Sequence, residues 1–223
     1  MAPPALSLDC ASVAIPQHGK ERNPKGEDAH FYQSNCVGVF DGVGGWASEG
    51  VNPRRYAQGM MQYTQSAIAE KEYSDPKELL WEAFRRNKEE GSCTACVATL
   101  QSVFLQVAWL GDSGAMLLRD GVIHRRFQPQ QHKFNQPYQL CHKENSDSPD
   151  DVGLWDVVVL EGDILIMGTD GLFDNLIESQ ILLASQNYFR RVKGSIMKVL
   201  LKNPEIRNLI NEQRLSNAMK TFF

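Results

Sequence analysis

The sequence predicts an α+β fold built on antiparallel sheets. β-prone runs are concentrated in the middle of the 223-residue chain, and segments with helical periodicity lie on both sides of them. One polar break, Asp120-Gly121 between Ala115–Arg119 and Val122–Arg126, is a strong signal for a two-residue hairpin. Strands joined by hairpins pair antiparallel, which favours α+β over a doubly wound α/β sheet.

The N-terminal half begins with a strand and a helix. Cys36–Phe40 is a short apolar run that ends at Asp41-Gly42, as a buried strand does where it enters a turn. Pro53–Lys71 is predicted to be helical, since Pro53 suits a first helical position. Apolar residues recur in this segment at near-helical spacing: Tyr56, Met60, Tyr63 and Ala67.

A second helix is predicted over Asp75–Glu90. Asp75 can cap this helix, Pro76 can occupy its first position, and Glu78 stands where a capping box requires an acidic side chain. The buried stripe would consist of Leu79, Leu80, Ala83 and Phe84.

The central strands are followed by a polar loop and a further strand pair. Thr94–Leu100 and Val103–Leu110 are two β-prone runs with a short polar break. Gln128–Gly153 has little periodicity and is predicted to be a long functional loop. Trp155–Leu160 and Asp163–Gly168 are predicted to pair with each other around a Glu-Gly turn.

The C-terminal part reads as helical. Leu176–Arg191 is predicted to be a helix whose start Asn175 and Glu178 can cap, and further helical segments follow. No internal repeat or linker interrupts the sequence, and its length suits a single domain over residues 1–223.

Composition and charge exclude several classes of protein. A net charge of −4 and a pI near 5.8 argue against a general nucleic-acid or anionic-membrane binder. No apolar run is long enough to span a bilayer, and residues 1–17 fit neither a secretory signal nor a transit peptide. The five irregularly spaced cysteines indicate a reduced intracellular protein, and Cys93-x-x-Cys96 lacks the partner pair of a zinc site. We expect a monomer; cytoplasm, mitochondrion and plastid all stay open.

Acidic residues follow or end apolar runs in Gly-rich settings. They are Glu27 and Asp28 after Gly26, Asp41 before Gly42, Asp112 after Gly111, and Asp170 before Gly171. Carboxylates at strand ends, beside glycines that allow close backbone approach, suit a site for a hard cation. Asp41 could bridge two Mg²⁺ or Mn²⁺ ions, with the Gly42 carbonyl as a further ligand, and Asp170 has a matching context. Two such ions can activate a water for in-line attack on a phosphoryl group, without a Ser, Cys or His nucleophile.

The chain resembles the metal-dependent type 2C protein Ser/Thr phosphatases over roughly residues 10–180, with five motifs in family order. Residues 130–140 resemble the subgroup that contains mitochondrial-matrix and plastid members. The matching motifs are Gly26-Glu27-Asp28-Ala29, Val39-Phe40-Asp41-Gly42-Val43-Gly44-Gly45-Trp46, Gly91-Ser92-Cys93-Thr94-Ala95-Cys96, Leu110-Gly111-Asp112-Ser113-Gly114 and Thr169-Asp170-Gly171-Leu172-Phe173-Asp174-Asn175.

The resemblance implies a four-layer α/β/β/α sandwich of two antiparallel sheets flanked by helices, with Mn²⁺ or Mg²⁺ at one end. It implies catalysis by Asp41, Asp170, Glu27 and Asp28, which would act on phosphorylated protein substrates. Asp41 would bridge the two core ions, Gly42 would add its carbonyl, and Asp170 would bind one of the ions. Glu27 and Asp28 would act at the ions directly or through water, and Asp112 with Asp170 would hold a looser third ion.

Three features depart from the family pattern. Val43 stands where many members carry a His that is proposed as the general acid; a metal-bound water or His30 could substitute for it. Arg22 lies near the position of a phosphate-binding Arg, at imperfect spacing and in competition with Lys25. The segment from Leu176 onward shows no Asp-bearing final strand, so we expect a C-terminally incomplete domain.

Simpler interpretations stand beside these. Each Asp alone could be a turn carboxylate bonded to backbone amides, and Asp174 is better interpreted as a helix cap than as a ligand. The alternative function is a weak or inactive pseudophosphatase that acts as a binding module. A non-functional fragment with an exposed sheet edge is a third possibility.

Overall fold

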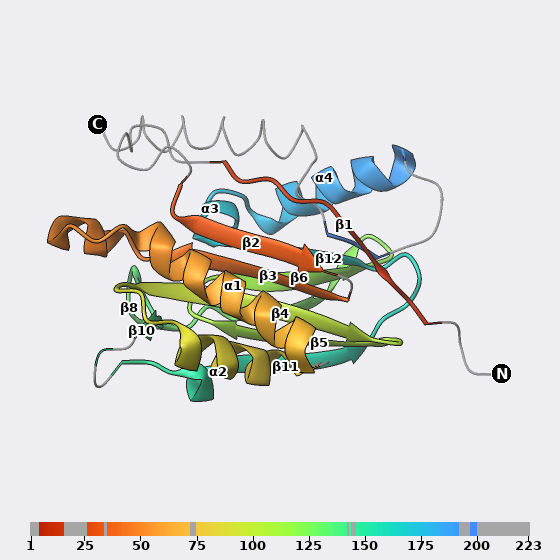
Figure 1. The fold of residues 1–223 in the computed structure, drawn as a ribbon. Helices are drawn as coiled ribbons and strands as arrows, with labels where there is room; N and C mark the ends of the chain where they lie inside the picture. The colour runs from red at the N-terminus through yellow and green to blue at the C-terminus, as the bar shows by residue number, and fades with distance from the viewer. Residues whose placement is uncertain are drawn as a thin grey trace, which may run out of the picture.

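The structure is a computed structural model, and it describes residues 5–15, 26–33, 35–71, 75–141, 143, 146–191 and 197–199. Two antiparallel sheets are stacked, and helices cover their outer faces (Figure 1). The predicted α+β class, and the four-layer order that the resemblance implied, are confirmed.

The large sheet has the strand order β11-β5-β4-β3-β2, and β10 pairs with the beginning of β4. All its pairings are antiparallel, and Gly42 at the end of β3 lies opposite Cys93 near the start of β4. The strands are β2 (Asp28–Gln33), β3 (Cys36–Gly42), β4 (Ser92–Gln101), β5 (Phe104–Leu110), β10 (Leu140–Cys141) and β11 (Gly153–Val158).

The small sheet has the order β12-β6-β7 and is also antiparallel. Its hairpin turns at Asp120 and Gly121, whose φ angles of 52° and 77° match the two-residue turn predicted from the sequence. Its strands are β6 (Gly114–Arg119), β7 (Val122–Arg126) and β12 (Ile164–Gly168). Two minor pairings complete the strands: β1 (Leu8–Cys10) with β13 (Met197–Val199), and β8 (Gln131–Lys133) with β9 (Gln136–Pro137).

Helices α1 (Pro53–Lys71) and α2 (Pro76–Arg86) pack against the outer face of the large sheet (Figure 1). The Asn52 side chain accepts a hydrogen bond from the Arg54 amide at 3.1 Å and starts α1. Asp75 caps α2 by accepting from the amides of Lys77 and Glu78 at 2.8 and 3.3 Å. The remaining helices are η1 (Gly44–Glu49), η2 (Pro149–Asp151), α3 (Asp170–Phe173) and α4 (Glu178–Arg191).

Three apolar cores separate the four layers. Strand β4 shows why, because alternate side chains of a strand point to opposite faces. Cys93, Ala95 and Val97 face α1 and α2, whereas Cys96 and Ala98 face the small sheet. The third core lies between the small sheet and α4, and it contains Met116, Leu118, Ile164, Ile166, Leu172, Leu176, Ile181 and Ala184.

Several predictions about elements were wrong in detail. Segment 128–153 was predicted to be a loop, but it contains β8, β9, β10 and η2. The runs at 155–160 and 163–168 do not pair with each other: β11 joins β5 in the large sheet, and β12 joins β6 in the small sheet. The turn between them therefore connects the two sheets.

Helix ends also differ from the prediction. α2 stops at Arg86, four residues before Glu90, and Asn87 follows with extended backbone. The last described helix starts at Glu178, after the separate short helix α3. Asn175 is not its cap, because the Asn175 side chain donates to the Gly171 carbonyl at 3.1 Å. Asp174 caps the C-terminal end of α3 and does not begin a helix.

The structure bears on two other expectations. Cys93 and Cys96 belong to different cores and face opposite sides of the large sheet, so they cannot share a zinc ion. All five cysteines are free thiols. Among the helices that the structure describes, none is both long and apolar enough to cross a bilayer.

Candidate metal centre

Three carboxyl groups meet where β2 and β3 lie next to the start of α3. Asp28 and Asp41 are direct partners in the β2–β3 ladder, and Thr94 of β4 lies opposite Asp41 on its other side. The Asp41 carboxyl shares hydrogen bonds with those of Asp28 and Asp170. Burial, reinforced by the negative charges of Asp28 and Asp170, raises the pKa of Asp41 well above its usual range. Without a cation or a shared proton, these groups repel one another.

Gly42 lets the chain leave β3 through a crowded gap. A Cβ on Gly42 would lie 2.4 Å from the Pro53 carbonyl oxygen and 3.0 Å from that of Glu27. The Gly42 amide donates to the Glu27 carbonyl at 3.3 Å, and the Val43 amide donates to the Ser92 carbonyl at 3.0 Å. The backbone around the Gly42 carbonyl is therefore fixed from two sides.

Asp170 comes from the small sheet. Strand β12 ends at Gly168, and Thr169 precedes the single turn of α3, which Asp170 begins. The amides of Leu172 and Phe173 donate to the Thr169 carbonyl at 2.9 and 3.2 Å and close this turn. The small sheet thus supplies a carboxylate to a site whose other members belong to the large sheet.

Asp112 lies in the turn between β5 and β6. Burial, followed by the charge of Asp170, raises its pKa to about 6. Gly111 precedes it with φ at 89°, which favours glycine. The buried hydroxyl of Ser113 lies 2.6 Å from that of Thr94, which ties this turn to the strand beside Asp41.

Two acidic residues extend the group. Asp174 at the end of α3 is exposed, yet its pKa is also raised, by partial burial and by Asp170. Glu27 takes part through its backbone, since its carbonyl accepts from Gly42. The structure thus brings Asp28, Asp41 and Asp170 into contact and puts Asp112 within electrostatic reach of Asp170.

Sequence reasoning missed some supporting residues. Arg54 in the first turn of α1 donates through Nη1 to the carbonyls of Asp28 and Gly26, at 2.5 and 3.3 Å, and fixes the start of β2. The Thr94–Ser113 contact was missed as well. For Arg54, its place directly after a helix-starting Asn-Pro was the sole local hint; the other contact depends on strand register.

Of the residues that depart from the family pattern, Val43 and its possible substitute His30 belong to the described residues. Arg22 and Lys25 lie outside the described residues. His30 Nε2 lies 2.9 Å from Ser12 Oγ, so its ring contacts the N-terminal segment. Burial and the charge of Arg54 lower the His30 pKa, which keeps the imidazole neutral near pH 7. The sequence also predicted that no Asp-bearing final strand follows Leu176. Most of the residues to which this prediction applies lie outside the described residues.

The donor set suits a hard divalent cation. All the candidate side chains offer oxygen, and their mutual repulsion around Asp41 is the kind that a cation relieves. In the described part of the chain, no three His, Cys, Asp or Glu side chains form a ready-made ligand cage. The carboxyl groups meet pairwise around Asp41, which fits Mg²⁺ or Mn²⁺, because such ions usually keep several waters.

Comparison with known proteins agrees with this geometry. A sequence profile described as Protein phosphatase 2C matches residues 48–209. The chain belongs to the protein phosphatase 2C family. The resemblance read from the motifs is thereby confirmed.

Several members of the protein phosphatase 2C family are similar in sequence. The probable protein phosphatases 2C 55 and 2C 80 of Arabidopsis thaliana are 41% and 38% identical to the chain over 180 and 182 residues. Both alignments cover 79% of this chain but only 38% and 44% of the two relatives. The protein phosphatase PTC7 homolog fig of Drosophila grimshawi is 36% identical over 177 residues, which cover 70% of the chain and 58% of that protein. The chain therefore spans about half the length of these curated relatives.

Solved structures of two phosphatases share the fold. The X-ray structure of the photosystem II phosphatase PBCP superposes with a TM-score of 0.76 at 30% identity, over 90% of this chain and 76% of that one. The catalytic domain of the Ser/Thr phosphatase PstP, in complex with 2 manganese ions, gives a TM-score of 0.59 at 19% identity, over 85% of each chain. At that identity the second likeness concerns the fold alone.

Proposed function

We propose that this protein hydrolyses phosphoserine or phosphothreonine in proteins, using two Mn²⁺ or Mg²⁺ ions. One observation carries the proposal: the Asp28, Asp41 and Asp170 carboxyl groups meet at the end of the sandwich in a chain of the protein phosphatase 2C family. We also propose that residues 1–223 belong to one domain, because the described strands and helices share contiguous cores.

The proposed ligands have distinct roles. Asp41 would bridge the two ions, the Gly42 carbonyl and Asp170 would complete their protein ligands, and Glu27 and Asp28 would bind directly or through water. When bound, the ions would activate water and neutralise charge on the phosphoryl group. Asp112 would hold a third ion with Asp170. The choice of metal rests on the donor set, because carboxylate and carbonyl oxygens suit Mn²⁺ or Mg²⁺.

The chain's own residues would position the substrate. We propose Arg22 as a group that binds the substrate phosphate, since a guanidinium can form two parallel hydrogen bonds with phosphate oxygens. Val43 has no proton to give to the leaving oxygen. That proton must therefore come from another group, and His30 is already engaged with Ser12.

The decisive experiment is Mn²⁺-dependent hydrolysis of a phosphothreonine peptide by this chain. We expect activity that rises with Mn²⁺ and falls about a hundredfold or more in Asp41→Asn, since losing even a group that only orients a ligand costs about 10–100-fold. Asp156→Asn on the exposed face of β11 is the matched control and should keep full activity. Trapping a covalent phosphoenzyme would contradict the mechanism.

A non-catalytic binding module is the alternative that Val43 favours. Isothermal calorimetry separates the two functions, because the enzyme needs at least two divalent ions bound under assay conditions. A folded chain that binds one ion or none, and binds the phosphopeptide without turnover, would support the binding module.

A further inference from the structure

A buried serine joins three parts of the molecule beside the candidate metal centre. Ser92 begins β4 and is fully buried. Its hydroxyl accepts a hydrogen bond from Trp46 Nε1 at 2.7 Å and donates to Gln139 Oε1 at 2.5 Å. Its carbonyl accepts from the Val43 amide at 3.0 Å. Ser92 therefore holds both ends of the turn from Val43 to Trp46, which directly follows Gly42.

Gln139 belongs to a stretch that we call the bridging segment, residues 128–141. Its amide donates to Asp147 Oδ2 at 3.0 Å, and the same carboxylate lies 2.9 and 3.0 Å from His132 Nε2. The His132 ring stacks on Tyr138, with ring centroids 4.2 Å apart. Asp147 thus fixes the backbone of Gln139, whose side chain contacts Ser92.

The other end of the bridging segment is tied to the Asp112 turn. The Gly111 amide donates to Gln130 Oε1 at 3.1 Å, and the Gln130 amide donates to the Gly111 carbonyl at 2.9 Å. Trp109 Nε1 also donates to the Gln128 carbonyl at 2.8 Å. The bridging segment therefore connects the turn that carries Asp112 with the turn that follows Gly42.

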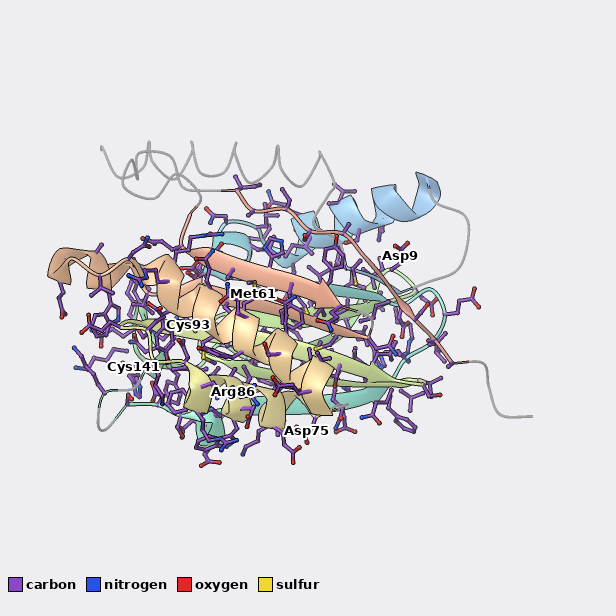
Figure 2. All side chains as sticks on the ribbon, viewed as in Figure 1. Asp9, Met61, Asp75, Arg86, Cys93 and Cys141 are labelled. Atoms are coloured by element: carbon purple, nitrogen blue, oxygen red, sulfur yellow. The ribbon has the colours of Figure 1, made fainter. Side chains whose placement is uncertain are left out.

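We call the contacts of Ser92 with Val43, Trp46 and Gln139 the Ser92 junction, and strand pairing places this junction beside Gly42 at the candidate metal centre. Cys141 of β10 pairs with Ser92, and Cys93 of β4 pairs with Gly42. Figure 2 labels Cys93 and Cys141, the neighbours of the junction on β4 and β10, near the end of the large sheet where β3 ends. A displaced Ser92 would thus reach the backbone of Gly42 through its two neighbours, the Val43 amide and Cys93.

We propose that Ser92 is a positioning residue: its hydroxyl ties the Gly42 turn to the bridging segment, so that divalent-ion affinity depends on the Ser92–Gln139 hydrogen bond. That the site binds a divalent ion is part of the proposed function, and this inference rests on it. The hydroxyl accepts a hydrogen bond from Trp46 and donates one to Gln139. A hydroxyl has a single hydrogen to donate, and here Gln139 receives it. Loss of the Gln139 acceptor would leave a buried donor unsatisfied and loosen the turn from Val43 to Trp46.

The test compares two substitutions at Gln139. Gln139→Leu keeps the approximate shape but removes the acceptor, whereas Gln139→Glu keeps an acceptor oxygen for the Ser92 hydroxyl. Calorimetry with Mn²⁺ alone should show affinity about three- to tenfold weaker in Gln139→Leu, the effect expected from one hydrogen bond. Gln139→Glu should stay near the wild type, and Ser92→Ala should resemble Gln139→Leu.

A second readout needs no metal. The chain has four tryptophans, so its indole N–H signals can be resolved by NMR and that of Trp46 assigned from Trp46→Phe. Hydrogen exchange of the Trp46 indole should be faster in Ser92→Ala and Gln139→Leu than in the wild type or Gln139→Glu. If Ser92→Ala does not fold, the two Gln139 variants decide alone.

Three results would overturn the inference: unchanged Mn²⁺ affinity in Gln139→Leu, equal weakening in both Gln139 variants, or unchanged Trp46 exchange in folded Ser92→Ala. A lower melting temperature with unchanged Mn²⁺ affinity would mark a merely structural role. If the wild type binds no Mn²⁺, the proposed function fails; Trp46 exchange in the metal-free chain then still decides whether the Ser92 link exists.

Discussion

Gly42 illustrates how single residues shape this site. Its carbonyl is a proposed ligand, but the structure demands glycine there for a separate reason, because the Pro53 backbone fills the space that a side chain needs. Gly45, three residues later, is exposed, and a Cβ there would meet nothing within 4 Å. Two glycines of the same motif therefore carry very different constraints.

Alanine at these two positions separates the constraints. We expect Gly42→Ala to destabilise the fold by about 1–3 kcal/mol, because backbone atoms must move to admit the methyl group. Gly45→Ala, the matched control, should change stability by no more than about 0.5 kcal/mol. Urea unfolding of metal-free protein measures both, and equal stabilities would show that the Pro53 contact yields easily.

Residue chemistry at the site was partly visible in the sequence. An Asp that ends an apolar run beside glycine marks a strand end; Asp41 is the last residue but one of β3, and Asp170 comes two residues after β12. The Ser92 junction was not visible, because a serine in a small-residue strand has no local signature. Its partners Trp46 and Gln139 lie 46 and 47 positions away in sequence.

At the scale of elements, the start of α2 shows how local chemistry fixes a boundary. Asp75 accepts from two backbone amides, and Pro76 needs no such partner. In the described helix the capping involves Asp75 alone: the reciprocal bond from the Asp75 amide to the Glu78 carboxylate, expected for a capping box, is not formed.

The cap therefore predicts unequal effects of two substitutions in α2. Asp75→Ala should lower the free energy of unfolding by about 1 kcal/mol, because two amides lose their acceptor. Glu78→Gln should cost only about 0.3 kcal/mol, from the lost interaction of its charge with the helix dipole. Thermal unfolding compares the two variants. An equal loss of stability in both would indicate that Glu78 takes part in a capping box after all.

Elements with local signals were predicted well, and those defined by distant pairing were not. α1 has the predicted bounds, and the Asp120-Gly121 hairpin formed as expected. β10 is only two residues long, and it is a strand only because it pairs with the first two residues of β4. β11 and β12 looked like a hairpin, since nothing local distinguishes a tight hairpin turn from one that crosses between sheets.

At the scale of the whole molecule, the site joins the two sheets. Asp28 begins a strand of the large sheet and Asp41 lies next to the end of another, whereas Asp170 follows a strand of the small sheet. Asp112 lies in the turn that passes from β5 in one sheet to β6 in the other. Like charges at this junction oppose the packing of the sheets unless a cation or protons compensate them.

The metal-free molecule should consequently lose stability as pH rises. The pKa of Asp112 is raised from 3.8 in an ordinary environment to about 6 in the fold, and that of Asp41 is also raised by burial and by Asp28 and Asp170. Between about pH 4 and pH 6 the folded chain binds more protons than the unfolded chain, so the free energy of unfolding falls as pH rises through this range.

Asp112→Asn should flatten this slope. Urea unfolding with a chelator tests it, and saturating Mn²⁺ should abolish the loss, because the ion binds the ionised carboxylates of the folded state. A slope that Mn²⁺ leaves unchanged would mean that these carboxylates do not bind the ion.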